Sequence, residues 1–475
     1  MPELEIHHIN VSQGDCTFVV NRDVSKISDA IDAALVAGSG LPPKPADEKD
    51  YLPYAVKNKV SLVGTIRRAL LIDAGDEAYG DDVAAYIAEQ GVTKANARDV
   101  LRSMATHYHA DHVGGFRDVF FEKFDFKKKL NEQKPYLVPK IAYDCGDLKK
   151  WDKTGTRAGY LAMVDALKSK VSRKTIRPNV KILMGDDGSG TPIKLRCIAA
   201  NGVVATRRTA VAEVINPKKS PDQNARSVVL VVEYGDFRYF LGADAGGTGE
   251  ESGGNFGKNK DTRTKTAFSS HPDIETSITE VLPKIYKKDA NRVNTADGHI
   301  CVHCADHHGS ASSNDVFLVE QMQPKVLVCS AGVRRSFHWH PTQEFFQRVD
   351  ANVGYSPKWQ EPGDTTNDNP TEDNTVAGYY ITEMAEDGRY GSGKSAKDYT
   401  RTLPNGKILG DVIVRPVSAV VPVNANGTNT ISIQVYGTGL GTADSVTSIP
   451  LRDKTAGTPG SLYPIGPFTH DCDKH

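Results

Sequence analysis

The sequence predicts an α/β fold, with one α/β domain over residues 1–354 and a β-rich extension over residues 355–475. Apolar, strand-like segments alternate with helical segments up to about residue 350. Histidine and aspartate residues gather where several predicted strands end, as is typical of α/β enzymes. After a stretch rich in Pro, Asp, Asn and Thr at residues 355–375, short β-rich segments return. We expect them to form a small β-module or to complete the main sheet.

The composition is that of a globular protein able to bury a sizeable core. The chain has 475 residues, 39% hydrophobic and 25% charged. It has no run of about 18 apolar residues and no basic start followed by an apolar segment, so we expect a cytoplasmic protein that does not cross a membrane. Its seven cysteines are odd in number and scattered, which favours reduced thiols. Cys301 and Cys304 have ligand-like spacing, but the apolar run around them favours core positions.

The net charge of −1 hides a basic region. Residues 123–219 contain 22 Lys and Arg against 9 Asp and Glu, a net charge of +13, which leaves −14 for the rest of the chain. Such a region suggests a surface for a polyanion such as a nucleic acid or a nucleotide. The alternative is that these side chains lie on solvated helix faces and pair with acidic neighbours.

The first predicted elements lead to a histidine-rich loop. Residues 4–20 and 68–76 read as β-strands that form a hairpin, and the Pro, Gly, Lys and Asp content of residues 21–66 indicates an insertion at the surface. Residues 81–92 have helical spacing and reach a glycine at position 91. A short strand then runs into Thr106 and the histidines after it.

The second half of the α/β domain repeats this pattern. Residues 224–247 read as two strands around a Gly-Asp turn, with Asp244 after the second. Residues 299–304 form a buried strand that enters the loop ADHHGSASS, and residues 325–332 form another strand. Between them, residues 315–323 form a helix, which we expect Ser313 or Asn314 to cap.

The segment THYHADHVGG carries the chemistry. Within six residues it offers three imidazoles and one carboxylate, which are donors for Zn²⁺, Fe or Mn²⁺. His107 and His109 can bind one metal while Asp111 and His112 face a second, with Asp244 as the natural bridge. Two metals about 3.5–4 Å apart can share a hydroxide that acts as the nucleophile at neutral pH.

These residues carry a family resemblance. The pattern His107-x-His109-x-Asp111-His112, followed by two glycines, resembles the signature of the metallo-β-lactamase superfamily, whose fold is an αββα sandwich. The segments NARSVVLVVEYGDFRYFLGAD, ADHHGSASSND and SAGVRRSFHWHP resemble, in order and spacing, the hydrolase domain of the ComEC/Rec2 competence proteins and their soluble relatives. The resemblance covers roughly residues 5–350, apart from the insertion.

The resemblance implies a set of metal ligands. It makes His107, His109, Asp111, His112 and Asp244 ligands of two divalent ions, Zn²⁺ or Mn²⁺, and one of His307 and His308 completes the second site. We favour His308, because that ligand often precedes a glycine in the superfamily, and its neighbour then contacts a ligand or the substrate.

The sequence departs from the family at one ligand. Most members supply a third histidine to the first metal before the bridging aspartate, but residues 113–243 contain no histidine. Asn224 falls near that position. An amide oxygen is a weaker ligand than imidazole, so the first metal is expected to be held loosely, to complete its shell with water, or to be Mn²⁺.

Further residues are candidates for substrate contacts. His340 matches a His-Pro pair that lies near the metals in the relatives, and it can donate a proton to a leaving oxygen or hold a phosphate; a surface histidine is the alternative. Arg334, Arg335 and Ser310 can bind a phosphodiester. Asp15 and Asp73 can orient ligand histidines by accepting an N–H, or can simply form turns.

The predicted function is metal-dependent hydrolysis, with Asp111 and His340 as catalytic residues. The basic region, the arginine pair and the competence-type resemblance favour a phosphodiesterase or nuclease. The alternatives are hydrolysis of a small ester, lactone or amide, and a metal-binding regulatory module with little catalysis.

Overall fold

The computed structural model of the protein describes most of its chain. The described part comprises residues 2–38, 40–125, 127–146, 155–186, 190–207, 210–213, 223–247, 273–287, 297–310, 312–332, 340–341, 345, 376, 378–382, 389–390, 394–395, 406–417, 431–438 and 465–472.

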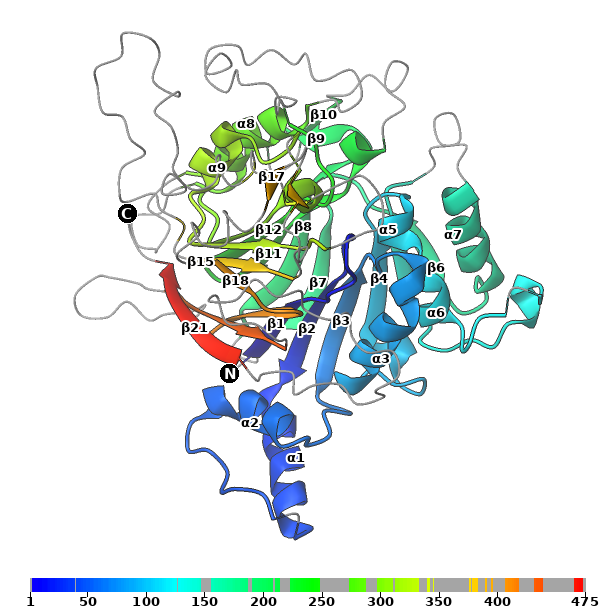
Figure 1. Ribbon diagram of the computed structural model, residues 1–475, viewed down its shortest axis with the longest axis vertical. Helices are drawn as coiled ribbons and strands as arrows, with labels where there is room; N and C mark the ends of the chain where they lie inside the picture. The colour runs from blue at the N-terminus through cyan, green and yellow to red at the C-terminus, as the bar shows by residue number, and fades with distance from the viewer. Residues whose placement is uncertain are drawn as a thin grey trace.

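Two large β-sheets pack face to face, with helices on their outer faces (Figure 1). The α/β class and the αββα layering predicted from the sequence are therefore confirmed. In the first sheet the strands lie in the order β21 (Ile465–Cys472), β20 (Ile431–Gly437), β19 (Val412–Pro416), β1 (Pro2–His8), β2 (Thr17–Asp23), β3 (Ile66–Ile72), β4 (Leu101–Ala105), β5 (Ile141–Asp144) and β6 (Ser172–Thr175). Strands β3 to β6 are parallel, and the others pair antiparallel.

The second sheet also mixes the two pairing modes. Its order is β10 (Val211–Glu213), β9 (Val203–Ala205), β8 (Pro192–Ala200), β11 (Val229–Tyr234), β12 (Phe237–Leu241), β13 (Val302–Cys304), β14 (Val326–Cys329), β15 (Gly378–Ile381) and β18 (Gly406–Ile408), and β7 (Lys181–Asp186) pairs with β8. From β12 to β18 the strands are parallel. A separate two-stranded ribbon joins β16 (Arg389–Tyr390) and β17 (Lys394–Ser395).

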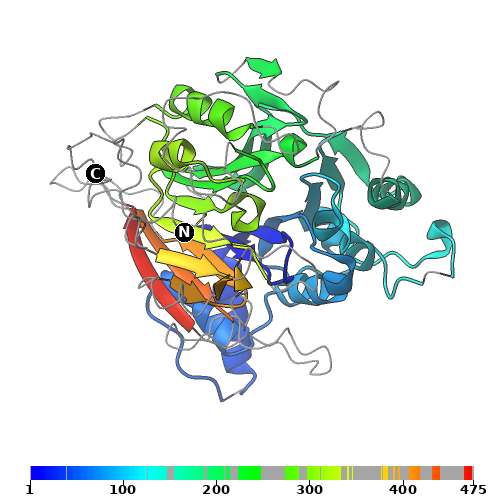
Figure 2. The same cartoon turned by 45° about the horizontal axis from the view of Figure 1, so that its top comes forward.

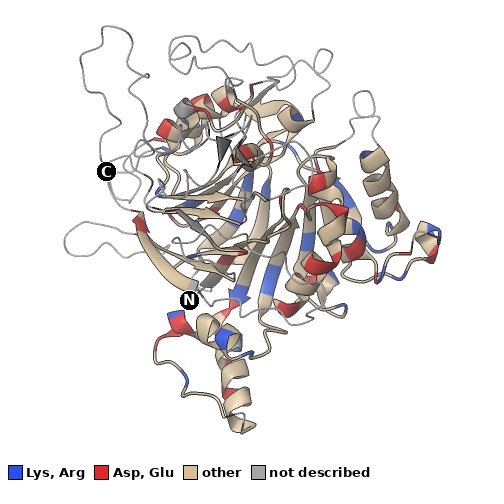
Figure 3. Ribbon diagram, viewed as in Figure 1, with Lys and Arg blue, Asp and Glu red and all other residues tan. Residues whose placement is uncertain are grey.

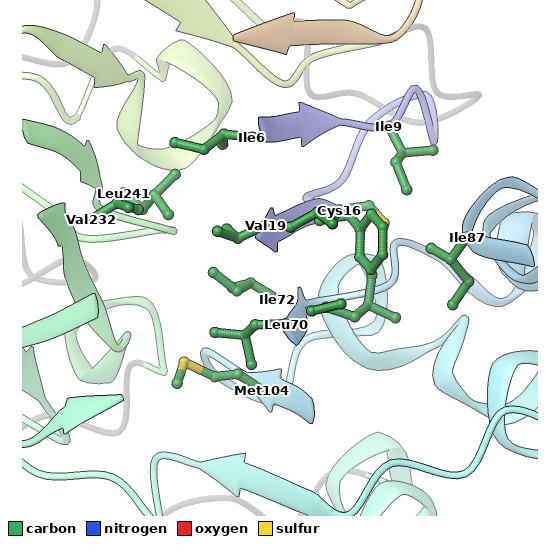
Figure 4. Packing of buried hydrophobic residues seen from close by; sticks show 14 of the residues in the cluster. Ile6, Ile9, Cys16, Val19, Leu70, Ile72, Ile87, Met104, Val232 and Leu241 are labelled. Carbon is green, nitrogen blue, oxygen red and sulfur yellow. The ribbon is translucent and has the colours of Figure 1, made fainter. Parts of the chain in front are cut away.

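The alternation of side chains along β11 shows how the layers form. Leu230 and Val232 point between the sheets, while Val229 and Val231 point to the other face, under the helices. Because both faces of this strand are buried, the run VVLVVEY is apolar almost throughout. Figure 4 shows the inner layer, in which Val232 and Leu241 face Leu70 and Met104 of the first sheet.

Helices cover both outer faces. The first sheet carries α3 (Gly80–Glu89), α4 (Ala97–Val100), α5 (Ala110–Val113), α6 (Phe116–Phe120) and α7 (Gly155–Ala166), and the second carries α8 (Glu275–Ile285) and α9 (Val316–Met322) (Figure 1). Short 3-10 turns lie at η1 (Glu48–Asp50), η2 (Glu77–Tyr79), η3 (Leu130–Glu132), η4 (Asn224–Arg226) and η5 (Asp306–Gly309). No described helix is long and apolar enough to cross a bilayer.

The N-terminal segment differs from the expectation. Residues 4–20 are not one strand: β1 and β2 form their own hairpin, and β3 joins the free side of β2. The chain reverses in the segment between them, where Ser12 and Gly14 have positive φ values of 58° and 147° and the Asn10 side chain accepts a hydrogen bond from the Ser12 N–H.

The segment between β2 and β3, expected to be an insertion at the surface, contributes to the core. The strand β2 extends through Asp23, and α1 (Val24–Val36) and α2 (Tyr51–Lys57) follow it. Ile27, Ile31 and Leu52 are fully buried and belong to the main core. Asp23 caps α1 by accepting a hydrogen bond from the Ser25 N–H.

The C-terminal strands add to both sheets. β15 and β18 extend the second sheet beyond β14, while β19, β20 and β21 extend the first sheet beyond β1 (Figure 2). Of the two expectations for this region, completion of the main sheets is the one that the structure shows. Strands from both sides of residue 354 therefore share each sheet, and residues 355–375 lie outside the described part.

Candidate metal centre

The strand β4 delivers four potential donors to one edge of the first sheet. His107 and His109 follow the strand in a loop, and Asp111 and His112 lie on the single turn of α5. His107 and His112 are completely buried, whereas His109 and Asp111 are partly exposed. The spacing thus directs two side chains inward and leaves two nearer to solvent.

Asp244 stands opposite these histidines, just after β12. Its Oδ1 lies 3.2 Å from Nε2 of His112, and its Oδ2 lies 3.6 Å from Nε2 of His107. The carboxylate is almost fully buried. Asp244 therefore faces both inward-pointing histidines, one with each oxygen.

The histidine pair comes from the loop after β13. His307 and His308 both have left-handed backbone angles, with φ of 50° and 55°, which turn consecutive side chains to different sides of Asp244. His308 Nε2 lies 3.5 Å from Asp244 Oδ1 and 3.7 Å from Asp111 Oδ2. His307 Nε2 lies 3.8 Å from Asp244 Oδ2 and 3.2 Å from the amide nitrogen of Asn224.

These side chains form two groups with metal-ligand geometry. One consists of His107, His109 and Asp244, and the other of Asp111, His112 and His308; within each, the donor atoms lie within 4.8 Å of one another. The Nε2 atoms of His107, His112 and His308 and the Oδ1 of Asp244 are buried without a hydrogen-bond partner in the described part of the chain. Buried polar atoms are normally satisfied, so these four fit bound cations.

A family comparison agrees with this geometry. Residues 56–168, which include His107 to His112, match the model described as "Metallo-beta-lactamase superfamily". This segment of the chain is therefore similar to members of that superfamily. Members of this superfamily are generally metal-dependent hydrolases, and the two donor groups described above are of the kind that a dinuclear metal site requires.

Three solved structures are similar to this chain. MEM-A1, a subclass B3 metallo-β-lactamase from a soil metagenome library, is 11% identical, with 47% of this chain and 67% of that chain covered and a TM-score of 0.21. Zn²⁺-bound PqqB from Methylobacterium extorquens is 13% identical, with coverages of 52% and 80% and a TM-score of 0.24. The metallo-β-lactamase-fold protein YhfI from Bacillus subtilis is 10% identical, with coverages of 64% and 86% and a TM-score of 0.23.

Two aspartates, Asp73 and Asp15, contact the Nδ1 atoms of two candidate ligand histidines. Asp73 Oδ2 lies 2.8 Å from Nδ1 of His112, and the same carboxylate accepts hydrogen bonds from the backbone N–H and the hydroxyl of Thr106. Asp15 Oδ1 lies 3.4 Å from Nδ1 of His308, which is also 3.0 Å from the Ser330 carbonyl oxygen. Both contacts direct the Nε2 atoms toward Asp244.

Burial and neighbouring charges shift the pKa values of three groups at this centre. Burial raises the pKa of Asp73 to about 6, against the opposing effect of His112. Burial alone would lower the pKa of His308, but Asp244 and Asp15 raise it to about 9. Burial likewise opposes ionisation of Asp244, yet His112, His307 and His308 hold its pKa well below the usual value. The centre therefore favours an ionised carboxylate surrounded by imidazoles.

The remaining candidate contacts lie at different places. The His340 ring is 5.6 Å from the His307 ring and 6.1 Å from the His308 ring, so it stands beside the pair. Ser310 is buried in the same loop, where its hydroxyl lies 3.1 Å from that of Ser312. Arg334 and Arg335 lie outside the described residues.

The loop with the histidine pair is braced by residues that sequence reasoning missed or misassigned. Asn314 does not cap α9, whose N-cap is Asp315. Instead, its Oδ1 accepts hydrogen bonds from the Asp306 N–H and from His303, and its amide donates to the Asp306 carbonyl. Glu275 of α8 accepts the backbone N–H groups of Asn314 and Asp315. Only the tertiary fold brings Glu275 here, since it is about 40 residues away.

Several cations of the basic region have acidic partners. Arg173 pairs with Asp144 at 2.5 Å, and Arg196 and Lys194 both pair with Glu233, at 2.5 and 3.0 Å. Figure 3 shows Lys and Arg distributed over strands of both sheets rather than along one element. Glu233, which lies outside residues 123–219, thus neutralises part of the excess charge, but these cations lie on strands and not on the solvated helix faces of the alternative interpretation.

Proposed function

We propose that this protein is a hydrolase of phosphodiester bonds, of the nuclease or phosphodiesterase type, that uses two divalent metal ions, Zn²⁺ or Mn²⁺. The observation that carries the proposal is the meeting of two donor groups at one buried carboxylate, Asp244. When bound, two adjacent divalent ions supply Lewis acidity toward the scissile group and lower the pKa of water.

The chain's own residues have distinct tasks in this proposal. His107 and His109 would hold the first ion, Asp111, His112 and His308 the second, and Asp244 would contact both. His307 lies near Asp244 Oδ2, as His107 does, and beside Asn224, which falls near the position of the third histidine of most relatives. This position supports a role for His307 in strengthening the weaker first site.

The leaving group of the reaction needs a proton donor, in addition to the residues that hold the metal ions. Cleavage of a phosphodiester leaves an alkoxide oxygen that must gain a proton. His340 stands beside the histidine pair and is partly exposed, so it is our candidate for that donor. Asp73 and Asp15 act through the ligand histidines, by fixing which ring nitrogen faces the metals.

The substrate class rests on charge and resemblance. The net charge of +13 over residues 123–219 supports a polyanionic substrate, and the exposed β6 includes two of these cations. The resemblance to ComEC/Rec2-type competence proteins favours a nucleic acid or a nucleotide. Arg334, Arg335, Asn224 and Ser310 are the proposed contacts with the phosphate.

The test combines metal analysis with a substrate panel. Protein loaded with Zn²⁺ or Mn²⁺ is assayed on bis(p-nitrophenyl) phosphate, on single- and double-stranded DNA, and on chromogenic esters and lactones. We expect turnover of phosphodiesters, steeply reduced by salt on DNA. Asp111→Ala and Asp244→Ala should lose bound metal and activity together, while the exposed control Asp81→Ala of α3 should keep both.

Each of the other outcomes would assign a different function to this protein. Turnover of lactones or esters alone would assign the acyl-hydrolase alternative. Stoichiometric metal without turnover of any substrate would assign the regulatory module. Activity that persists in metal-free Asp244→Ala would contradict the metal-dependent mechanism itself.

A further inference from the structure

A second cluster of metal-binding side chains lies away from Asp244. His299 and Cys301 precede β13, and Cys472 is the last residue of β21. All three are buried, and their ring nitrogen and sulfur atoms lie within 4.8 Å of one another. Since the His307-His308 loop follows the carboxyl end of β13, the cluster lies at the opposite end of that strand.

The fold joins very distant parts of the chain at this cluster. β13 belongs to the second sheet, whereas β21 is the edge strand of the first, and Cys472 is 173 residues from His299. The backbone around Cys301 is fixed to β12, because its N–H donates to the Arg238 carbonyl and the Arg238 guanidinium donates to the His299 carbonyl. The cluster is therefore built on ordered backbone at the β13 end.

The donor set is that of a thiophilic metal. The Sγ of Cys472 lies 3.8 Å from Nε2 of His299, a separation that one ion with Zn–S of about 2.3 Å and Zn–N of about 2.0 Å can span. Thiolate and imidazole together select Zn²⁺ among the common divalent ions. A disulfide between the two cysteines would use the sulfurs but give no role to the imidazole beside them.

We propose that His299, Cys301 and Cys472 bind a third metal ion, Zn²⁺, which fastens the C-terminal strand β21 to the start of β13. The ion takes two sulfur donors and one nitrogen donor from the chain and a water in the fourth position, as three-ligand zinc sites do. This proposal is independent of the hydrolytic function, because it shares no residue with the centre at Asp244.

Cobalt substitution distinguishes the two kinds of site. The donors around Asp244 are nitrogen and oxygen, so of the two sites the proposed one alone offers the thiolates that give a thiolate-to-Co²⁺ charge-transfer band in the near ultraviolet. We expect this band in the full-length protein loaded with Co²⁺, and we expect Zn²⁺-loaded protein to hold about one ion more than the Cys472→Ser variant. Cys472→Ser should lose the band, whereas the control Cys197→Ser should keep it.

Measurements on the unaltered protein test the proposal even if a variant fails to fold. X-ray absorption at the zinc edge should show a sulfur shell at about 2.3 Å. Absence of that shell, or of the charge-transfer band, would overturn the proposal. A band that survives in Cys472→Ser, or a Cys301–Cys472 disulfide found by mass spectrometry after anaerobic purification, would overturn it equally.

Discussion

Replacement of Asp73 by Asn should weaken metal binding without removing any ligand. The carboxylate accepts three hydrogen bonds, two from Thr106 at 2.8 and 2.5 Å and one from His112 Nδ1 at 2.8 Å. In the Asp73→Asn variant an NH₂ group replaces one of the two oxygens, and it cannot accept a hydrogen bond from the imidazole N–H. His112 then loses the contact that keeps its Nε2 aimed at Asp244.

The size of the effect follows from the lost bond. A hydrogen bond to a charged group contributes about 1.5–3 kcal/mol, and this range corresponds to about a 10- to 100-fold change in affinity. Loss of a partner that orients a ligand histidine has the same measured size, about 10- to 100-fold. The two independent estimates agree, so we expect a decrease in affinity of that order for the ion held by His112.

Competition with a chromophoric chelator measures the affinity, and a thermal melt monitors folding. The matched control is Asp76→Asn, a half-buried residue three positions along, whose carboxylate accepts a hydrogen bond from the Ala78 N–H in its own turn. An Asp73→Asn affinity within about threefold of the unaltered protein would refute the orienting role, since that is well below the expected range. An equal loss in Asp76→Asn would show that the effect is not specific to His112.

Three further predictions concern stability. Arg22→Leu should destabilise the protein by about 3–5 kcal/mol in urea unfolding, because it leaves the buried Glu5 carboxylate without its 2.5 Å partner; a change below about 1 kcal/mol would mean that Glu5 finds another partner or a proton. Gly115→Ala should lower the free energy of unfolding by about 1–3 kcal/mol, because the new Cβ would lie 2.1 Å from the Ala74 carbonyl oxygen. The control is Gly155→Ala, at an exposed position where a new Cβ would meet no atom within 4 Å. Burial lowers the pKa of His8 and of His303 to about 4. Between pH 6.5 and pH 4 these histidines therefore take up protons in the unfolded chain but not in the folded protein. Each histidine should lower the free energy of unfolding by about 3 kcal/mol over that range. His303→Gln, which keeps a donor toward Asn314, should flatten this acid decline relative to the unaltered protein, and an unchanged decline would contradict the burial argument.

Local sequence information predicted much of the scaffold of the centre. Strand β11 and strand β12 could be read from two apolar runs around a Gly-Asp turn, and the loop after β4 from a strand that ends in closely spaced donors. Such features depend on residues adjacent in the chain, so periodicity and turn residues reveal them.

The sequence could not show how the two histidines of the pair divide their contacts. That division depends on two consecutive left-handed backbone conformations at His307 and His308, which non-glycine residues rarely adopt. The role of Asn314 was mistaken for a helix cap for a similar reason: its partners Asp306 and His303 become neighbours only when the loop folds back. Contacts of this kind are set by tertiary packing, which outweighs local preference.

The pairing of β1 has a consequence for synthesis on the ribosome. One edge of β1 pairs with β2, but the other pairs with β19, where Ile6 is opposite Val414 and His8 is opposite Val412. About 400 residues separate the partners, and at about 5–20 residues per second the second partner emerges roughly 20–80 s after the first. Throughout that time the nascent chain has an open strand edge that can pair with other chains. Translation speed and chaperone access should therefore affect the yield of native protein more than its final stability suggests.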